Sequence, residues 1–241
     1  MSKLQLDERI GRASLLPLSD DERHEILRTT FRQWRENGRI PNVATKALDI
    51  TKLEMGDLIL LKASSPGLIQ RGIRRGQKLE FPASMGDHWM FSHAMVSRGG
   101  DETYEANADE QVHRNTFWDH MDGTNTFKVM RLPNKSIQNR AQIALNAAEL
   151  TGRQYDTFGA FFASIEQVRR FFPYRDRDSN DNSFMCSSVF AAACFYEGID
   201  LGLGIENKDA VTPRFISPAA LSASPYLVEI DMPLLNLSDY E

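Results

Sequence analysis

Phe91–Val96 (FSHAMV) predicts a β-strand that carries a histidine. Further along the chain, Ser183–Val189 (SFMCSSV) predicts the start of a helix with Cys186 in its first turn. A thiol becomes a nucleophile when its thiolate is favoured, and both the positive end of a helix and a nearby imidazole favour it. His93 and Cys186 therefore predict a thiol enzyme in which the histidine precedes the cysteine.

The composition predicts a globular protein without general affinity for nucleic acid. Of the 241 residues, 41% are hydrophobic and 25% are charged, and the formal net charge is −5. No apolar run approaches the roughly 20 residues of a membrane helix, and Met1–Arg12 has no signal-peptide core. We expect no nucleic-acid partner, no membrane span and no Sec signal, so the protein is either cytoplasmic or exported by a dedicated secretion system.

Capping signals and periodicity predict an α+β fold with an antiparallel sheet packed against helices. Ser19–Glu22 has the form of a capping box and opens a helix that ends near Asn37. The apolar stripe of this helix should pack on the main body: Ile26, Leu27, Phe31 and Trp34. We predict an N-terminal helical appendage over residues 1–50 and a catalytic domain over 51–241. Strands are expected at 57–61, 91–97, 102–106, 126–132 and 226–230, and further helices at 68–75, 136–150, 158–172 and 183–198.

The two cysteines are expected to be free thiols. If both lie on one helix, Cys186 and Cys194 are separated by roughly 12 Å along its axis, which is too far for a disulfide. Cys194 lies in an apolar helix middle and is expected to pack in the core. A metal site from Asp87, His88 and His93 has no recognised ligand spacing, so we expect no metal and no other cofactor.

A hairpin signal at Ser97–Glu102 determines what His93 faces. A three-residue loop, Arg98–Gly100, would place His93 directly opposite Glu105, within reach of an imidazole–carboxylate hydrogen bond. A two-residue loop would place His93 opposite Ala106 and turn Glu105 to the other side of the sheet. A Cys–His–Glu triad therefore needs a loop with an odd number of residues. In such a triad, Glu105 would orient the imidazole and His93 would exchange a proton with Cys186.

Other side chains are candidates for binding the substrate. Arg71 and Arg74 belong to a basic cluster before His93 that would attract carboxylates or phosphates, although it also fits a solvated surface. The full set of predicted substrate-binding residues is Arg71, Arg74, Trp89, Ser92, Tyr155 and Ser187. We expect His24, His88, His113 and His120 to be surface residues.

The order of these motifs resembles the circularly permuted branch of the NlpC-type papain-like enzymes, which share it with lecithin:retinol acyltransferase-like proteins. The resemblance covers residues 53 to 230 and rests on short motifs: Gly56-Asp57, Ser92–Val96, Tyr104–Ala106, Tyr155-Asp156, Cys186–Val189 and Pro218–Val228. It implies a permuted papain-like fold with Cys186 as nucleophile, His93 as base and Glu105 as orienting residue. Relatives often have glutamate where this chain has Ser188.

The resemblance implies a cysteine peptidase or amidase that cleaves a peptidoglycan stem peptide through an acyl-enzyme. Without a signal peptide, such an enzyme would be an exported antibacterial effector or would act on recycled fragments in the cytoplasm. Its partners would be the peptide substrate and, if it is exported, an immunity protein or a secretion-apparatus protein, and we expect a monomer. Two alternatives stay open. One is an acyltransferase or lipid amidase with an apolar groove lined by Phe158, Phe161 and Phe162, and the other is a non-catalytic binding module.

Overall fold

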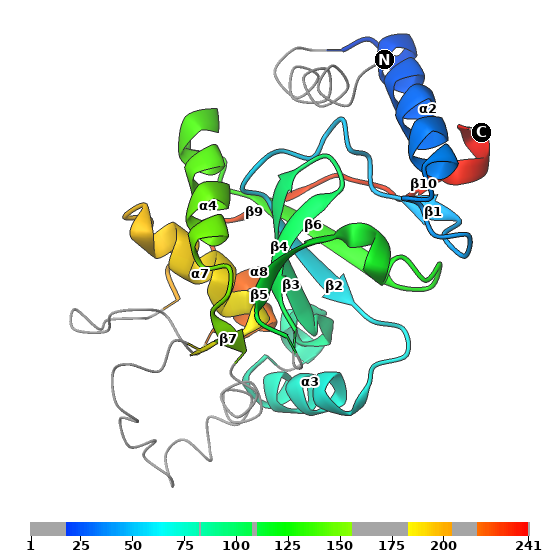
Figure 1. The fold of residues 1–241 in the computed structure, drawn as a ribbon. Helices are drawn as coiled ribbons and strands as arrows, with labels where there is room; N and C mark the ends of the chain where they lie inside the picture. The colour runs from blue at the N-terminus through cyan, green and yellow to red at the C-terminus, as the bar shows by residue number, and fades with distance from the viewer. Residues whose placement is uncertain (1–17, 82, 108–109, 156–182, 204–215, 241) are drawn as a thin grey trace, which may run out of the picture.

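The computed structural model describes residues 18–81, 83–107, 110–155, 183–203 and 216–240. Its centre is a six-stranded sheet in which all neighbouring strands are antiparallel, in the order β5-β4-β3-β2-β6-β9 (Figure 1). The strands are β2 (Leu58–Lys62), β3 (His93–Gly99), β4 (Glu102–Ala106), β5 (Val112–Thr116), β6 (Thr126–Arg131) and β9 (Val228–Ile230). Two small sheets pair β1 (Lys46–Ala47) with β10 (Leu235–Asn236), and β7 (Gln154–Tyr155) in parallel with β8 (Ser183–Phe184).

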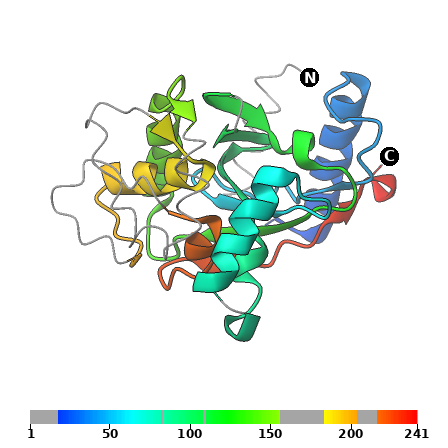
Figure 2. The same cartoon turned by 90° about the horizontal axis from the view of Figure 1, so that it is seen from below.

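Helices cover both faces of this sheet (Figures 1 and 2). Helices α4 (Ile137–Glu149) and α7 (Cys186–Tyr196) pack on one face, and α2 (Asp20–Glu36) packs on the other. The remaining helical elements are α3 (Leu68–Glu80), α8 (Pro218–Ser222) and the 3-10 turns η1 (Ala83–Met85), η2 (His88–Met90), η3 (Phe117–His120) and η4 (Leu237–Asp239). The predicted class is confirmed: the fold is α+β, with an antiparallel sheet packed against helices.

The central strand β2 explains why the sheet is covered on both sides. Successive side chains of a strand point to opposite faces. Leu58 and Leu60 lie in the core shared with α4 and α7, whereas Ile59 and Leu61 lie in the core shared with α2. All four are buried, so this strand is a continuous apolar run rather than an alternating one.

The N-terminal helix begins as predicted. The backbone N–H of Glu22 donates to Ser19 Oγ at 3.3 Å, and the Glu22 carboxylate accepts the N–H of Ser19 at 2.9 Å. Helix α2 buries Leu27, Phe31 and Trp34 against the sheet, while Ile26 is half-buried. The expectation that its apolar stripe packs on the main body is confirmed.

Three local expectations were wrong. Helix α3 continues to Glu80 instead of ending at Arg75, because the Gln77 side chain donates to the carbonyls of Trp89 and Phe91 and so holds the extra turn in place. Ser183 does not cap α7; it lies in β8 and pairs with Gln154. The cap position of α7 is Met185, whose side chain makes no capping hydrogen bond.

Several further elements of the structure are not predicted by the sequence patterns. Strand β5 was not predicted because Val112 is its one apolar, buried residue. The short helix α8 has clear signals in retrospect, since Ser217 caps it and Pro218 occupies its first turn. The predicted helix at 158–172, with Phe158, Phe161 and Phe162, lies outside the described residues.

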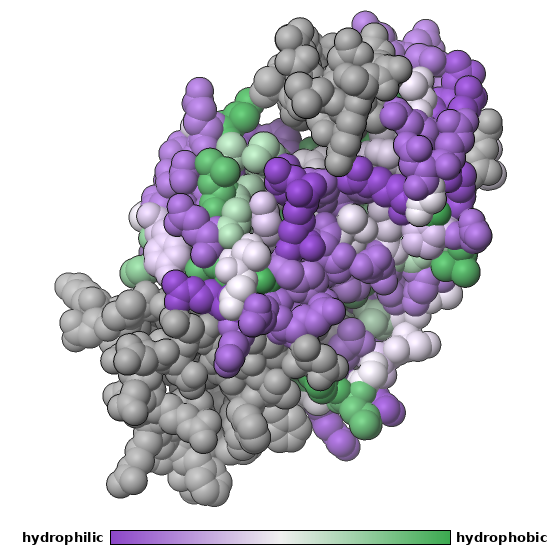
Figure 3. Space-filling model, in the orientation of Figure 1, coloured by the Kyte–Doolittle hydropathy of each residue, from purple (hydrophilic) through white to green (hydrophobic). Residues whose placement is uncertain are grey.

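The described part of the surface is mainly hydrophilic on the face seen in Figure 3, with small apolar areas between the hydrophilic residues. Among the described residues, none of the helices combines the length and the apolar character needed to cross a membrane.

Candidate active site

Cys186 is the first residue of α7, so its side chain lies at the positive end of a helix dipole. The residue is buried, and its sulfur accepts hydrogen bonds from the backbone N–H groups of Ala94 and Ser187. Burial would raise the pKa of this thiol, but the charge of His93 and its hydrogen bond to the sulfur outweigh burial and lower the pKa. The surroundings of Cys186 therefore favour its thiolate more than those of an ordinary thiol do.

His93 is the first residue of β3, and its imidazole bridges two groups. On one side, its Nε2 lies 2.5 Å from Glu105 Oε2. On the other side, it is hydrogen-bonded to the Cys186 side chain, which leaves Nδ1 as the ring nitrogen that faces the sulfur. Burial disfavours the charged imidazolium, but the negative charges of Cys186 and Glu105 raise the pKa of His93 to about 10.

Glu105 is completely buried in β4 and accepts hydrogen bonds on both oxygens. Oε2 accepts from His93 and from His120 Nε2, the latter at 2.9 Å. Oε1 accepts from Asn115 Nδ2 and, at 3.5 Å, from Asn107 Nδ2. Burial would raise the pKa of this carboxyl, but the charges and hydrogen bonds of the two histidines hold it well below its ordinary value. Glu105 is therefore a fixed carboxylate.

The predicted strand register is wrong by two residues. Ser97 pairs with Thr103, not with Asp101, because Arg98 forms a β-bulge between Ser97 and Gly99. Glu105 consequently lies diagonally from His93 and not directly opposite it. A shift of two residues leaves both side chains on the same face of the sheet, and the diagonal spacing of roughly 7–8 Å between Cα positions is bridged by the length of the two side chains. The triad contact therefore survives the error.

The structure thus brings Cys186, His93 and Glu105 together. This contact crosses the sheet, because Cys186 lies on a helix that packs on one face and the His93 side chain belongs to the opposite face. Met95 shares the face of His93 and lies in the core with α2, whereas Ala94 lies in the core with α4 and α7. His93 and Cys186 can meet because each is the first residue of its element, so the two elements begin side by side.

Two predicted substrate-binding residues make contacts that stabilise the fold. A guanidinium N–H of Arg74 donates to the carbonyl of Ala63, and burial lowers the pKa of this side chain. Ser187 Oγ donates to the carbonyl of Ile216, which links α7 to the start of α8.

The other four lie in different surroundings. Arg71 is exposed on α3, and Trp89 is half-buried in η2 with Lys78 Nζ 4.9 Å from its ring centroid. Ser92 is buried next to His93, and its hydroxyl has no hydrogen-bond partner among the described residues. Tyr155 lies in β7, at the edge of the described residues.

His120 is the residue of this site that sequence reasoning missed. It ends the 3-10 turn η3, and its ring centroid lies 5.1 Å from that of His93. No periodic pattern announces a 3-10 turn, so His120 was expected to be a surface residue. The metal site considered from the sequence (Asp87, His88 and His93) is arranged differently, because Asp87 pairs with Lys62 and His88 with Ser222. Instead, His93, Glu105 and His120 place their ligand atoms within 4.8 Å of one another.

Comparison with known proteins corrects the predicted family. No model of a protein family and no curated protein matches this chain. One similar solved structure is the crystal structure of the metalloprotein yiiX from Escherichia coli O157:H7, DUF1105. It shares 17% sequence identity with this chain at a TM-score of 0.49, and the match covers 75% of this chain and 97% of that one. The structural neighbour is thus a DUF1105 metalloprotein and not an NlpC-type papain-like enzyme, and the resemblance inferred from short motifs was wrong.

Proposed function

We propose that this protein is a thiol hydrolase that cleaves an amide bond through an acyl-enzyme. The observation that carries the proposal is the continuous chain of hydrogen bonds from Cys186 through His93 to Glu105. A lowered thiol pKa, a raised imidazole pKa and a buried carboxylate are the arrangement that a nucleophile, a general acid–base and an orienting group require.

The first half of the reaction forms a thioester. The Cys186 thiolate attacks the carbonyl carbon, and the carbonyl oxygen becomes an oxyanion. First-turn amides of a helix lack intrahelical partners, so the backbone N–H of Cys186 is suited to donate to this oxyanion. His93 then gives its Nδ1 proton to the leaving nitrogen, the carbon–nitrogen bond breaks, and the free amine departs.

The second half returns the enzyme to its starting state. Neutral His93 takes a proton from water, and the resulting hydroxide attacks the thioester carbonyl. The carbon–sulfur bond breaks, the carboxylic acid leaves, and the thiolate–imidazolium pair forms again. Glu105 keeps the Nε2 proton of His93 in place throughout and stabilises the imidazolium whenever it is present.

Peptides with free carboxylates are the substrates that we propose to test first, and peptidoglycan stem peptides are among them. Helix α3 carries the exposed Arg71 and Arg75. Gln77 holds this helix against the segment that leads into His93, through bonds to the carbonyls of Trp89 and Phe91. The positive charges therefore lie on a helix that contacts the segment directly before His93.

The test is incubation of purified peptidoglycan with the protein, followed by mass analysis of the released fragments. We expect new amine and carboxylate ends, which are absent with Cys186→Ala and present with Cys194→Ala, a matched control on the same helix. A covalent adduct whose mass equals the substrate's acyl group should appear on Cys186. Fragments released equally by Cys186→Ala would end the proposal.

A further inference from the structure

Glu105 has more histidine contacts than a triad requires. In a Cys–His–Glu arrangement the carboxylate orients one imidazole, yet Oε2 accepts from both His93 and His120, at 2.5 and 2.9 Å. On the other oxygen, the amide of Asn115 serves as donor. An amide would satisfy Oε2 equally well, so the second imidazole calls for another explanation.

We propose that His93, Glu105 and His120 form a binding site for a zinc-like divalent cation, and that this cation and the thiol reaction exclude one another. Two imidazole nitrogens and one carboxylate oxygen are a ligand set that suits Zn²⁺, with a fourth position left for water. The binding itself does not depend on the proposed function, whereas its effect on the reaction rests on that function.

The distances allow such a site with small movements. Ligands about 2.0–2.1 Å from a tetrahedral Zn²⁺ lie roughly 3.3 Å from one another. The contacts of Glu105 Oε2 with the two rings would therefore lengthen by less than about 1 Å. The three ligand atoms already lie within 4.8 Å of one another.

The surroundings hold the ligands in place and leave one side open. Asn115 and Asn107 occupy the other oxygen of Glu105, so Oε2 stays directed at the two rings. Asn125 donates to the carbonyl of His120 at 2.9 Å, which fixes the end of η3. The His120 side chain is 17% exposed, against 9% for His93 and 0% for Glu105, so a cation would enter beside His120.

The sulfur lies on the opposite side of the shared ring. His93 Nε2 faces Glu105, which leaves Nδ1 for Cys186. A cation on Nε2 replaces the proton there, and that proton goes to solvent. The remaining proton stays on Nδ1, so the metal-bound ring neither gives a proton to the leaving amine nor takes one from water. Formation and hydrolysis of the acyl-enzyme are then both blocked, although Cys186 is not a ligand.

Zinc binding is best measured directly, by native mass spectrometry and calorimetry on the metal-free full chain. We expect one Zn²⁺ per chain, with affinity reduced at least tenfold in His120→Gln. In His120→Lys the ammonium can still donate to Glu105 but cannot ligate at neutral pH, so it should lose the ion as well. Cys186→Ala and the control His24→Gln, an exposed histidine on α2, should keep it.

A second measurement follows the thermal unfolding midpoint. Zn²⁺ should raise the midpoint of the wild type and of Cys186→Ala, because it binds only the folded state, and leave both His120 variants unchanged. The inference is overturned if the wild type binds no ion, if both His120 variants bind it as tightly, or if Cys186→Ala loses it. None of these outcomes bears on peptide cleavage. Conversely, a protein that binds zinc as expected but cleaves no peptide would contradict the proposed function and leave the zinc site supported.

Discussion

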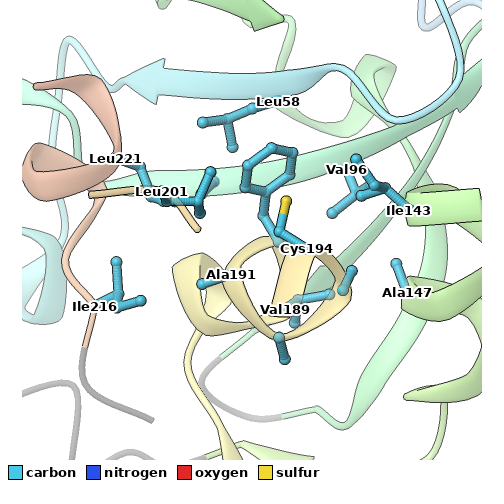
Figure 4. Close-up of a cluster of buried hydrophobic side chains, with 14 of the residues drawn as sticks. Leu58, Val96, Ile143, Ala147, Val189, Ala191, Cys194, Leu201, Ile216 and Leu221 are labelled. Atoms are coloured by element: carbon cyan, nitrogen blue, oxygen red, sulfur yellow. The ribbon is translucent and has the colours of Figure 1, made fainter. Parts of the chain in front are cut away.

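Cys186 and Cys194 lie on the same helix and are both buried, yet the pKa values of their thiols shift in opposite directions. Cys194 packs among apolar side chains that include Leu58, Val96 and Ile143 (Figure 4), and burial raises its pKa. Cys186 is in contact with His93, and its pKa is lowered. Burial alone makes a thiol inert, so the difference between a packing cysteine and a candidate nucleophile comes mainly from the charge and hydrogen bond of His93, with backbone N–H groups adding to it.

The largest expected difference is in turnover. Cys186→Ala should reduce peptide hydrolysis by about 10³-fold or more, because the attacking sulfur is lost. Cys194→Ala should change it by less than about twofold, because this side chain lies in the core shared by the sheet, α4 and α7. Initial rates on a peptide released from peptidoglycan measure both. Equal losses of activity in the two variants would contradict the different roles assigned to the two cysteines.

The second prediction concerns reaction with iodoacetamide, followed at each cysteine by peptide mass analysis. At neutral pH, Cys186 should react about 10²-fold faster than Cys194, because the pKa of Cys186 is lowered and that of Cys194 is raised. The apparent titration of Cys186 should lie below the ordinary thiol value of 9.0. His93→Gln should move it upward, because burial then acts without the compensating charge. An unchanged apparent pKa of Cys186 in His93→Gln would show that His93 does not stabilise the thiolate.

A smaller effect is expected at the third member of the triad. Glu105→Gln keeps a hydrogen-bond acceptor for His93 but removes the charge that stabilises the imidazolium. We expect kcat to fall by about 10²-fold, less than for Cys186→Ala or His93→Ala. The Cys186 pKa should rise by less than in His93→Gln. A wild-type kcat in Glu105→Gln would show that the imidazole needs no carboxylate.

These expectations depend on contacts that the sequence reveals to different degrees. Local signals predicted the capping box at Ser19, strand β4 and the helix that carries Cys186, because each needs only neighbouring residues. The partner of His93 depended on the hairpin register, and the bulge at Arg98 shifted that register without changing the face of the sheet. His120 reaches Glu105 through the end of a 3-10 turn. No spacing along the chain encodes that contact, so it could not be predicted.

The region around Cys186 should also be the pH-sensitive one. The pKa of Glu105 is lowered in the folded protein, so its charge stabilises the fold above its ordinary value of 4.5, and this contribution is lost as the pH falls through the lower folded value. Wild type should exceed Glu105→Gln in stability by about 2 kcal/mol at pH 7, and the gap should close towards pH 2. Urea unfolding at several pH values measures it. A constant gap would contradict the assigned charge.

The smallest effect is expected in the core around Cys194. Cys194→Ala removes one buried sulfur atom and should cost about 1 kcal/mol in the free energy of unfolding. This loss should not vary with pH, because the side chain stays a neutral thiol across the range in which Glu105 titrates. The same urea series provides the measurement. A loss that follows the pH would show that the two ends of α7 are coupled.

The pairing of β1 with β10 has a consequence for how the protein is made. Lys46 pairs with Asn236, and Leu237 completes the core in which Leu27 and Phe31 are buried. On the ribosome, at about 5–20 residues per second, the emerging α2 waits on the order of 10 s for these partners. Ile59, Met95 and Trp118 of the same core emerge earlier, so the apolar stripe of α2 is only partly covered until the C-terminal segment arrives, and its uncovered part is a surface that a chaperone can bind.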